Sequence, residues 1–170
     1  MATVYVALLR AVNVGGTGKL PMSELRKMCE SAGFESVRTY IASGNVVFAS
    51  EAPAAVVKAA LESRLAQYAG KPVGVMIRTS KEMAAILEAN PFPDAPPNRV
   101  VTVFLDDVPP RDALRHAIGV RSEAMRLGKR EIYIHYGDAM AGSKLKIPAA
   151  ANGTARNMNT VAQLAVMSGQ

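Results

Sequence analysis

The sequence has few of the residues on which several protein classes depend. Its 170 residues include one cysteine (Cys29), two histidines (His116 and His135) and no tryptophan. One cysteine cannot form a disulfide within the chain, and one cysteine with two histidines cannot supply the usual four ligands of structural zinc. We therefore expect a cytoplasmic protein from a reducing compartment, with no metal site and no cofactor.

Long hydrophobic runs are also missing. The apolar run at residues 4–9 is far too short to span a bilayer, and no basic segment precedes it as in a secretory signal. We expect no membrane partner. The net charge of +6 is a modest excess and only 5% of the residues are aromatic, so nucleic acid is an alternative partner that the composition does not favour. The sequence leaves the choice between monomer and homodimer open.

The first half of the chain has a clear order of elements. With 49% hydrophobic residues, a chain of this size can bury roughly 70% of its unfolded surface around a core. Apolar patterning, glycines and prolines predict strands at 4–10, 37–42, 46–49 and 73–78, and helices at 21–32 and 54–69. The order β-α-β-β-α-β is the ferredoxin-like motif.

The second half repeats part of this order. Thr79 and Glu82 have capping-box spacing, which predicts a helix to about residue 89. Four prolines in 90–98 indicate a boundary between lobes. Beyond it we expect a strand (99–105), a short helix (110–118), a hairpin (121–127 and 130–136), a loop (138–152) and a last helix (157–167). The sequence thus predicts an α+β protein in one compact unit, with a ferredoxin-like subdomain (1–90), a Pro-rich connection (91–98) and a β-α-β-β subdomain with a C-terminal helix (99–170).

The first candidate site is the Gly-rich turn after the first strand. Glycines let backbone N–H groups approach a phosphate, and a following helix N-terminus favours negative charge. Gly15, Gly16 and Gly18 match neither the Walker A nor the dinucleotide-binding spacing. A plain strand-to-helix turn is the competing interpretation. The residues left for function are Arg10 at the strand end, and Asn13 and Lys19 around the turn; Arg10 and Asn13 are the ligand-binding candidates.

The second candidate is a group of polar residues at the predicted start of the last helix and in the loop before it. One helix cap needs only one such residue, so the surplus suggests an anion site, in which an arginine can grip a phosphate or carboxylate with two hydrogen bonds. Capping alone is the competing interpretation. The candidates are Ser143, Lys144, Thr154, Arg156, Asn157 and Asn159.

The third candidate is the predicted hairpin turn with Ser43, Gly44 and Asn45, although ordinary turn chemistry explains all three residues. Asp106 and Asp107 could hold a magnesium ion, but such a strand end more often only turns the chain. The two histidines have no acid and nucleophile at a recognisable spacing. No catalytic residue is therefore assigned.

Several stretches resemble, in order along the chain, a bacterial family known as domain of unknown function 1697. They are residues 8–16, 21–25, 38–41, 43–48, 130–133, 143–145 and 154–157. The resemblance implies a soluble bacterial α+β protein of two subdomains, the first ferredoxin-like. It implies no reaction, because the activity of the family is not established. Ala11 stands where the family often has glycine, and Met158 stands where it often has an aromatic residue, so a stacking surface at that position is in doubt.

From these candidates we expect the protein to bind a phosphorylated or otherwise anionic small ligand, such as a nucleotide. The hypothesis takes the end of the first strand, the Ser43 turn and the start of the last helix to converge on one site. One alternative is an enzyme of group transfer or hydrolysis in the same pocket, with Ser143 as nucleophile and Lys144 and Arg156 stabilising charge. Another alternative is a module that binds nucleic acid or protein.

Overall fold

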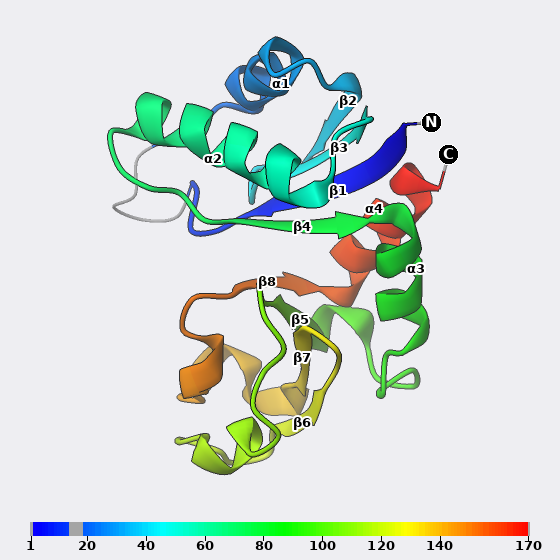
Figure 1. Ribbon diagram of the computed structural model, residues 1–170. Coiled ribbons are helices and arrows are strands. Elements are labelled where there is room, and N and C mark those ends of the chain that lie inside the picture. Colours follow the sequence, from blue (N-terminus) through cyan, green and yellow to red (C-terminus); the bar gives the residue numbers. More distant parts are fainter. Residues whose placement is uncertain (1, 14–18, 170) are drawn as a thin grey trace. The chain divides into compact units, whose positions relative to one another are not determined.

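The computed structural model describes residues 2–13 and 19–169 of the chain. The chain divides into two units, one formed by Met1–Ala84 with Leu164–Gln170 and the other by Ala85–Gln163. Each unit contains one four-stranded antiparallel sheet (Figure 1). The predicted α+β class with two subdomains is therefore confirmed, whereas the predicted boundary at 91–98 stays a prediction.

The first unit has the order of elements that the sequence predicts. Its strands lie in the order β2-β3-β1-β4, and β1 is antiparallel to both β3 and β4. Helices α1 and α2 lie on the same face of this sheet (Figure 1). The elements are β1 (Thr3–Leu9), α1 (Met22–Ser31), β2 (Glu35–Tyr40), β3 (Asn45–Ser50), α2 (Ala54–Ala69) and β4 (Val75–Thr79). This arrangement confirms the ferredoxin-like subdomain.

The central strand β1 is buried on both faces of its sheet. Tyr5, Ala7 and Leu9 belong to the core on the side of the helices, and the alternation of a strand turns Val6 and Leu8 to the opposite face. None of these side chains is more than 4% exposed. The unbroken apolar run in the sequence is typical of such a strand.

Local signals set the ends of two helices as the sequence predicts. Helix α2 ends at Gly70, which adopts a left-handed φ of 72° and donates its N–H to the carbonyl of Ala66 at 2.9 Å. Helix α3 (Ser80–Glu88) begins with the predicted capping box. The backbone N–H of Thr79 donates to Oε1 of Glu82 at 2.9 Å, and the N–H of Glu82 donates to Oγ1 of Thr79 at 3.1 Å.

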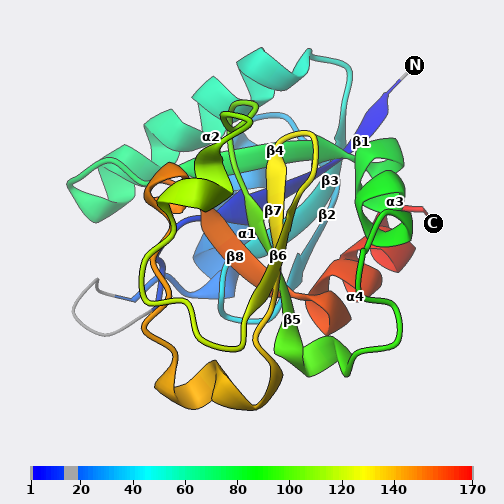
Figure 2. The ribbon, with the colours of Figure 1, turned by 90° about the horizontal axis from the view of Figure 1, so that it is seen from below.

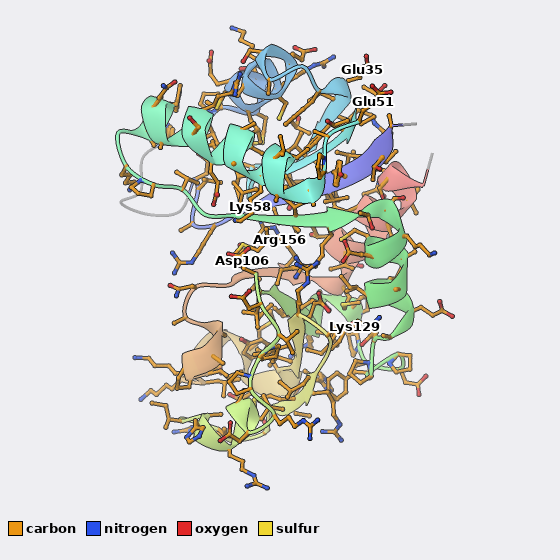
Figure 3. The ribbon with its side chains drawn as sticks, viewed as in Figure 1. Glu35, Glu51, Lys58, Asp106, Lys129 and Arg156 are labelled. Carbon is orange, nitrogen blue, oxygen red and sulfur yellow. The ribbon has the colours of Figure 1, made fainter. Side chains whose placement is uncertain are left out.

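A lysine also ties α2 to the sheet below it. Lys58 Nζ donates to the carbonyl of Val75 on β4 at 2.5 Å and lies 3.0 Å from a carboxylate oxygen of Glu62. Figure 3 shows this side chain on α2, next to β4. The ammonium group therefore serves the fold and is not available to a ligand.

The second unit repeats the strand order of the first with less helix. Its sheet has the order β6-β7-β5-β8 (Figure 2), in which the central strand again pairs antiparallel with both neighbours. Short 3-10 turns stand where the first unit has helices. The elements are η1 (Pro97–Arg99), β5 (Val100–Phe104), η2 (Ala113–His116), β6 (Ala124–Leu127), β7 (Glu131–His135), η3 (Gly137–Gly142), η4 (Pro148–Ala150), β8 (Thr154–Asn157) and the final helix α4 (Met158–Ser168).

One expected helix start is a strand. Thr154 and Arg156, which the sequence places at the beginning of the last helix, lie on β8, and α4 begins only at Met158. Arg156 is opposite Thr102 of the central strand. Pairing with a strand fifty residues earlier decides this conformation, and a short polar segment carries no local sign of it.

The short helix predicted for 110–118 is also smaller than expected. Only Ala113–His116 forms a 3-10 turn there. Pro109 and Pro110 precede this turn, and Gly119 follows it with a left-handed φ of 74°. These residues leave too few positions for the hydrogen bonds of a regular α-helix.

Candidate functional site

Asn13 connects the segments that meet at the end of β1. Its Nδ2 donates to the carbonyls of Leu20 and Ala42, both at 2.8 Å, and its Oδ1 accepts the N–H of Leu20 at 2.6 Å. The residue has a left-handed φ of 55°, which asparagine tolerates better than most residues. The amide is thus occupied by the backbone of this chain, and Asn13 shapes this region. The other residues of the Gly-rich turn, 14–18, lie outside the described part of the chain.

The Ser43 turn packs against the same end of β1. Nδ2 of the fully buried Asn45 donates to the carbonyl of Tyr40 and to Oγ of Ser43, both at 2.9 Å. The N–H of Leu9 donates to the carbonyl of Gly44 at 2.8 Å. A Cβ atom on Gly44 would lie 2.6 Å from Cγ2 of Val12, so this close approach requires glycine. The structure therefore brings Asn13, Ser43 and Asn45 together as groups that hold the backbone.

A pocket of about 210 Å³ lies beside these segments in the first unit. Its buried wall is apolar, formed in part by Val12, Leu20 and Leu65. Lys19 and Lys71 line it too, with exposed side chains that form no ion pair with any residue the structure describes. The remaining lining residues are Ala11, Tyr68, Ala69 and Val73. The pocket combines two free positive charges with an apolar floor.

The sequence analysis named Lys19 beside the Gly-rich turn, but it did not single out Tyr68 and Lys71 as site residues. These two stand at the end of α2, where they look like ordinary surface residues. Arg10, which was singled out, is exposed at the end of β1 and donates its N–H to the carbonyl of Gly74 at 2.9 Å. The sequence signals for the pocket are the place of Lys19 directly after the Gly-rich turn and that of Lys71 directly after Gly70, which ends α2.

Arg156, labelled in Figure 3, is a buried residue of β8. It is 7% exposed, and its Nη1 donates to Oγ1 of Thr154 at 2.6 Å and to the carbonyl of Ala155 at 2.9 Å. Burial lowers the pKa of its guanidinium to about 10. The group remains charged at neutral pH and is held by its own strand.

The residues next to Arg156 begin helix α4. Oδ1 of Asn157 accepts the N–H of Thr160 at 3.0 Å, which is the N-cap interaction that the sequence allows for this residue. Asn159 lies exposed in the first turn of α4. Asn157 is therefore the cap of α4, and the other polar candidates lie either on β8 (Thr154 and Arg156) or in the first turn of α4 (Asn159).

Ser143 belongs to a different cluster of the second unit. Its Oγ donates to a carboxylate oxygen of Glu123 at 2.6 Å, and the other oxygen accepts the N–H of Arg121 at 2.8 Å. These bonds, that of Ser143 first, hold the pKa of the Glu123 carboxyl below its ordinary value. A carboxylate stabilised in this way is a weak general base, so the pair does not support Ser143 as an activated nucleophile.

The sheet order separates the two parts of the second candidate site. Glu123 directly precedes β6 at one edge of the sheet, and Arg156 lies on β8 at the other edge. Three interstrand spacings make about 14 Å. Lys144, exposed beside Ser143, is therefore not brought to Arg156, and the convergence of the three candidate regions on one site stays a prediction.

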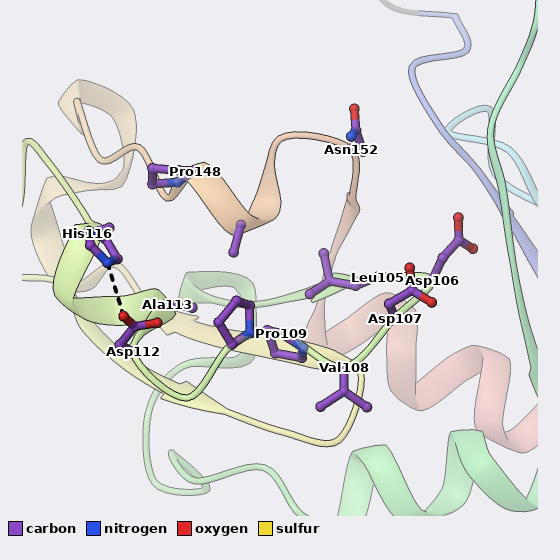
Figure 4. A pocket seen from close by; sticks show the side chains of 12 residues that line it. Leu105, Asp106, Asp107, Val108, Pro109, Asp112, Ala113, His116, Pro148 and Asn152 are labelled. Carbon is purple, nitrogen blue, oxygen red and sulfur yellow. Dashed lines mark hydrogen bonds and ion pairs between the residues drawn. The ribbon is translucent and has the colours of Figure 1, made fainter.

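A larger cleft of about 600 Å³ lies within the second unit (Figure 4). Its lining includes Asp106, Asp107, Asp112 and His116, and Nε2 of His116 lies 3.2 Å from Oδ2 of Asp112. Carboxylates outnumber cations here, so the cleft does not suit an anion. Within residues 2–13 and 19–169, no three or more His, Cys, Asp or Glu side chains come together as metal ligands.

The fold and these sites define an α+β protein made of two units with the same strand order. Residues 2–133 match a family described as "Protein of unknown function (DUF1697)", and the chain belongs to this family. The chain is also similar to a solved structure, the conserved bacterial protein SP0830 from Streptococcus pneumoniae, with a TM-score of 0.83, 26% identity and 99% of each chain covered. No curated protein matches the sequence.

The family and the solved structure name no ligand and no reaction. Among the described helices, none combines the length and the apolar character that crossing a membrane requires. The ligand-binding residues named from the sequence stay predictions.

Proposed function

We propose that this protein binds a small phosphorylated ligand in the pocket between Lys19 and Lys71. The observation that carries the proposal is the pair of lysines, which have no carboxylate partner among the described residues, beside an apolar floor. An ammonium group acts on a phosphate as a compact positive charge with three donors. Two such groups at one pocket favour a ligand with negative charge.

The size and lining of the pocket narrow the ligand class. A volume of about 210 Å³ is below the roughly 300–1,000 Å³ of sites for drug-sized molecules. A sugar phosphate, or part of a mononucleotide, is of suitable size. Tyr68 lines the pocket and is 47% exposed, so its ring offers a face for an apolar ring of the ligand.

The same lining favours binding over catalysis. Among the described residues that line the pocket there is no histidine, cysteine, aspartate or glutamate. These are the usual general bases and nucleophiles of neutral active sites. Asn13 contributes by holding Leu20, which forms part of the floor.

The test is a thermal-shift and calorimetric titration at low salt with inorganic phosphate, adenosine monophosphate and glucose 6-phosphate. Adenosine and glucose are the uncharged controls. A ligand at about 100 times its dissociation constant stabilises the fold by about 2.7 kcal/mol. We expect one phosphorylated compound to shift the melting temperature saturably and its uncharged counterpart to have no effect.

Variants place the site. The double variant Lys19→Gln, Lys71→Gln is expected to weaken binding at least about tenfold. The double variant Lys81→Gln, Lys129→Gln removes the same charge from other exposed positions and is expected to bind as the wild type does. Equal affinity of both double variants, or no shift with any phosphorylated compound, contradicts the proposal.

A further inference from the structure

Two loop segments of the second unit lie side by side and are joined by one antiparallel β-bridge. Residues 117–121 and 143–147, which we name the basic ribbon, meet in an antiparallel bridge between Ile118 and Lys146. Each residue donates its N–H to the carbonyl of the other at 2.9 Å. Nothing in the proposed ligand pocket involves this ribbon, because the pocket lies in the first unit.

The ribbon is held in one conformation by contacts at its ends. Gly119 has a left-handed φ of 74°, and a Cβ atom there would lie only 2.2 Å from the carbonyl oxygen of Lys144. The carboxylate of Glu123 binds the N–H of Arg121 and the hydroxyl of Ser143. The two segments are thus joined by the backbone bridge, by the close packing at Gly119 and by the hydrogen bonds of the buried Glu123 side chain.

The alternation of the two segments divides the ribbon into an inner and an outer side. Ala117, Leu145 and Ile147 pack on the core of the second unit. Between these residues, Ile118 is 60% exposed and Lys146 is also exposed on the outer side. Strand periodicity places Lys144 on that side as well.

The outer side is basic and partly apolar. Val120 is 44% exposed, Arg121 at the end of the first segment is exposed, and Arg115 is exposed two residues before the ribbon begins. Across the described part of the chain, no ion pair involves these arginines, Lys144 or Lys146. Exposed aliphatic side chains among unpaired cations are typical of a surface that meets a partner.

We propose that the basic ribbon docks an extended acidic peptide segment of a partner protein, in which apolar side chains alternate with Glu or Asp. The backbone is extended on both sides of the lysines, with φ −65° and ψ 133° at Ser143 and φ −118° and ψ 110° at Ile147. Lys144 and Lys146 are then about 6.8 Å apart along the segment. Alternate side chains of an extended peptide have the same spacing, so two carboxylates can face the two lysines while an apolar side chain meets Ile118.

The chemistry favours a peptide over the other polyanions. Single-stranded nucleic acid is bound by basic grooves in which bases stack on aromatic rings, and the exposed apolar residues here are aliphatic. A membrane surface requires a larger apolar face, usually one side of an amphipathic helix, than Ile118 and Val120 provide. Both are therefore outcomes of the test that would overturn the proposal.

The test uses fluorescence anisotropy with the labelled peptide Gly-Ser-Glu-Val-Glu-Val-Glu-Ser-Gly and a matched peptide in which Gln replaces Glu. We expect saturable binding of the acidic peptide to the full-length protein at low salt, and binding of the Gln peptide at least about tenfold weaker. The variant Lys144→Gln, Lys146→Gln should weaken binding of the acidic peptide about tenfold. Ile118→Ser should weaken it about threefold, because the loss of apolar contact is smaller.

Control variants separate this site from general charge and from the proposed ligand pocket. The charge-matched variant Lys81→Gln, Lys129→Gln and the pocket variant Lys19→Gln, Lys71→Gln should both bind the acidic peptide as the wild type does. The proposal is overturned if the peptide does not bind, or if all three double variants lose affinity equally. It is also overturned if oligothymidylate or phosphatidylserine vesicles bind more tightly than the peptide through Lys144 and Lys146.

Discussion

Replacement of Asn13 tests whether one side chain organises the end of β1. The amide makes three hydrogen bonds, two with the backbone of Leu20 and one with the carbonyl of Ala42. Two variants of Asn13 separate the contribution of its amide hydrogen bonds from that of its left-handed backbone conformation. Asn13→Gly removes the amide and keeps the left-handed φ of 55° accessible, whereas Asn13→Ala removes the amide and also strains the backbone.

The expected magnitude follows from these contacts. A hydrogen bond contributes about 1 kcal/mol net, and a buried group left without a partner costs more. Leu20 is 6% exposed, so its N–H and carbonyl depend on Asn13, whereas Ala42 is exposed and its carbonyl can bind water instead. We expect Asn13→Gly to lower the free energy of unfolding by about 2 kcal/mol. The left-handed backbone adds about 1 kcal/mol in Asn13→Ala.

The assay is urea unfolding followed by far-ultraviolet circular dichroism. Asn159→Ala is the control, because Asn159 is exposed in the first turn of α4, and its change should stay within about 0.5 kcal/mol. The reasoning is refuted if both Asn13 variants unfold like the wild type. It is also refuted if Asn13→Gly is the less stable of the two, because backbone strain would then not contribute.

Three further predictions follow from other contacts. Hydrogen bonds lower the pKa of Glu123 in the folded state, so its stabilising contribution is present above its unfolded pKa and is lost as the pH falls through its folded pKa. On acidification, the melting temperature of Glu123→Gln should therefore fall less than that of the wild type. An equal fall in both proteins would contradict this prediction. Cys29 is fully buried and burial raises its pKa to about 12, so a thiol reagent at about pH 8 should modify it only after unfolding in urea, and rapid modification of the native protein would contradict its burial. Gly119→Ala places a Cβ atom 2.2 Å from a carbonyl oxygen and should lower the free energy of unfolding by more than about 2 kcal/mol in the same urea assay. The control Gly137→Ala has the same sign of φ and no atom within 4 Å of the new Cβ, so it should lower the free energy of unfolding by about 1 kcal/mol. Equal losses in both variants would contradict the close packing at Gly119.

The first unit could be predicted from the sequence because its signals are local. The apolar run of β1, the apolar stripe of α2 and the capping box of α3 each lie within one segment. Gly70 marks the end of α2 through a conformation that glycine adopts without strain. Each element was therefore visible without knowledge of its neighbours.

The second unit was less predictable because its conformation depends on distant partners. The strand β8 exists through its pairing with β5, and the polar residues Thr154 and Arg156 alternate with Ala155 in a pattern that resembles a loop before a helix. Ser143 meets Glu123 twenty residues away in sequence. No spacing rule connects such pairs, so their polar residues looked like free ligand groups.

Several candidate ligand-binding residues are hydrogen-bonded within the protein. A side chain that can bind a ligand can also satisfy a backbone group, and the sequence does not say which it does. Asn13, Asn45 and Asn157 all bind backbone atoms of this chain. Of the lysines that line the pocket, Lys19 was named from its place beside the Gly-rich turn, whereas Lys71 could not be recognised, because an exposed lysine beside a loop is ordinary in any sequence.

The two units differ in how their polar and charged side chains are used. In the first unit, helices α1 and α2 satisfy their own backbone groups over most of their length, and Lys19 and Lys71 form no ion pair with any residue that the structure describes. In the second unit, polar side chains bind several backbone groups: Tyr133 donates its hydroxyl to the carbonyl of Ile86 at 2.8 Å, Glu123 accepts the N–H of Arg121, and Arg156 donates to the carbonyl of Ala155. These interior polar groups of the second unit are thus used by the fold, whereas Lys144 and Lys146 of the basic ribbon are exposed and form no ion pair with any residue that the structure describes.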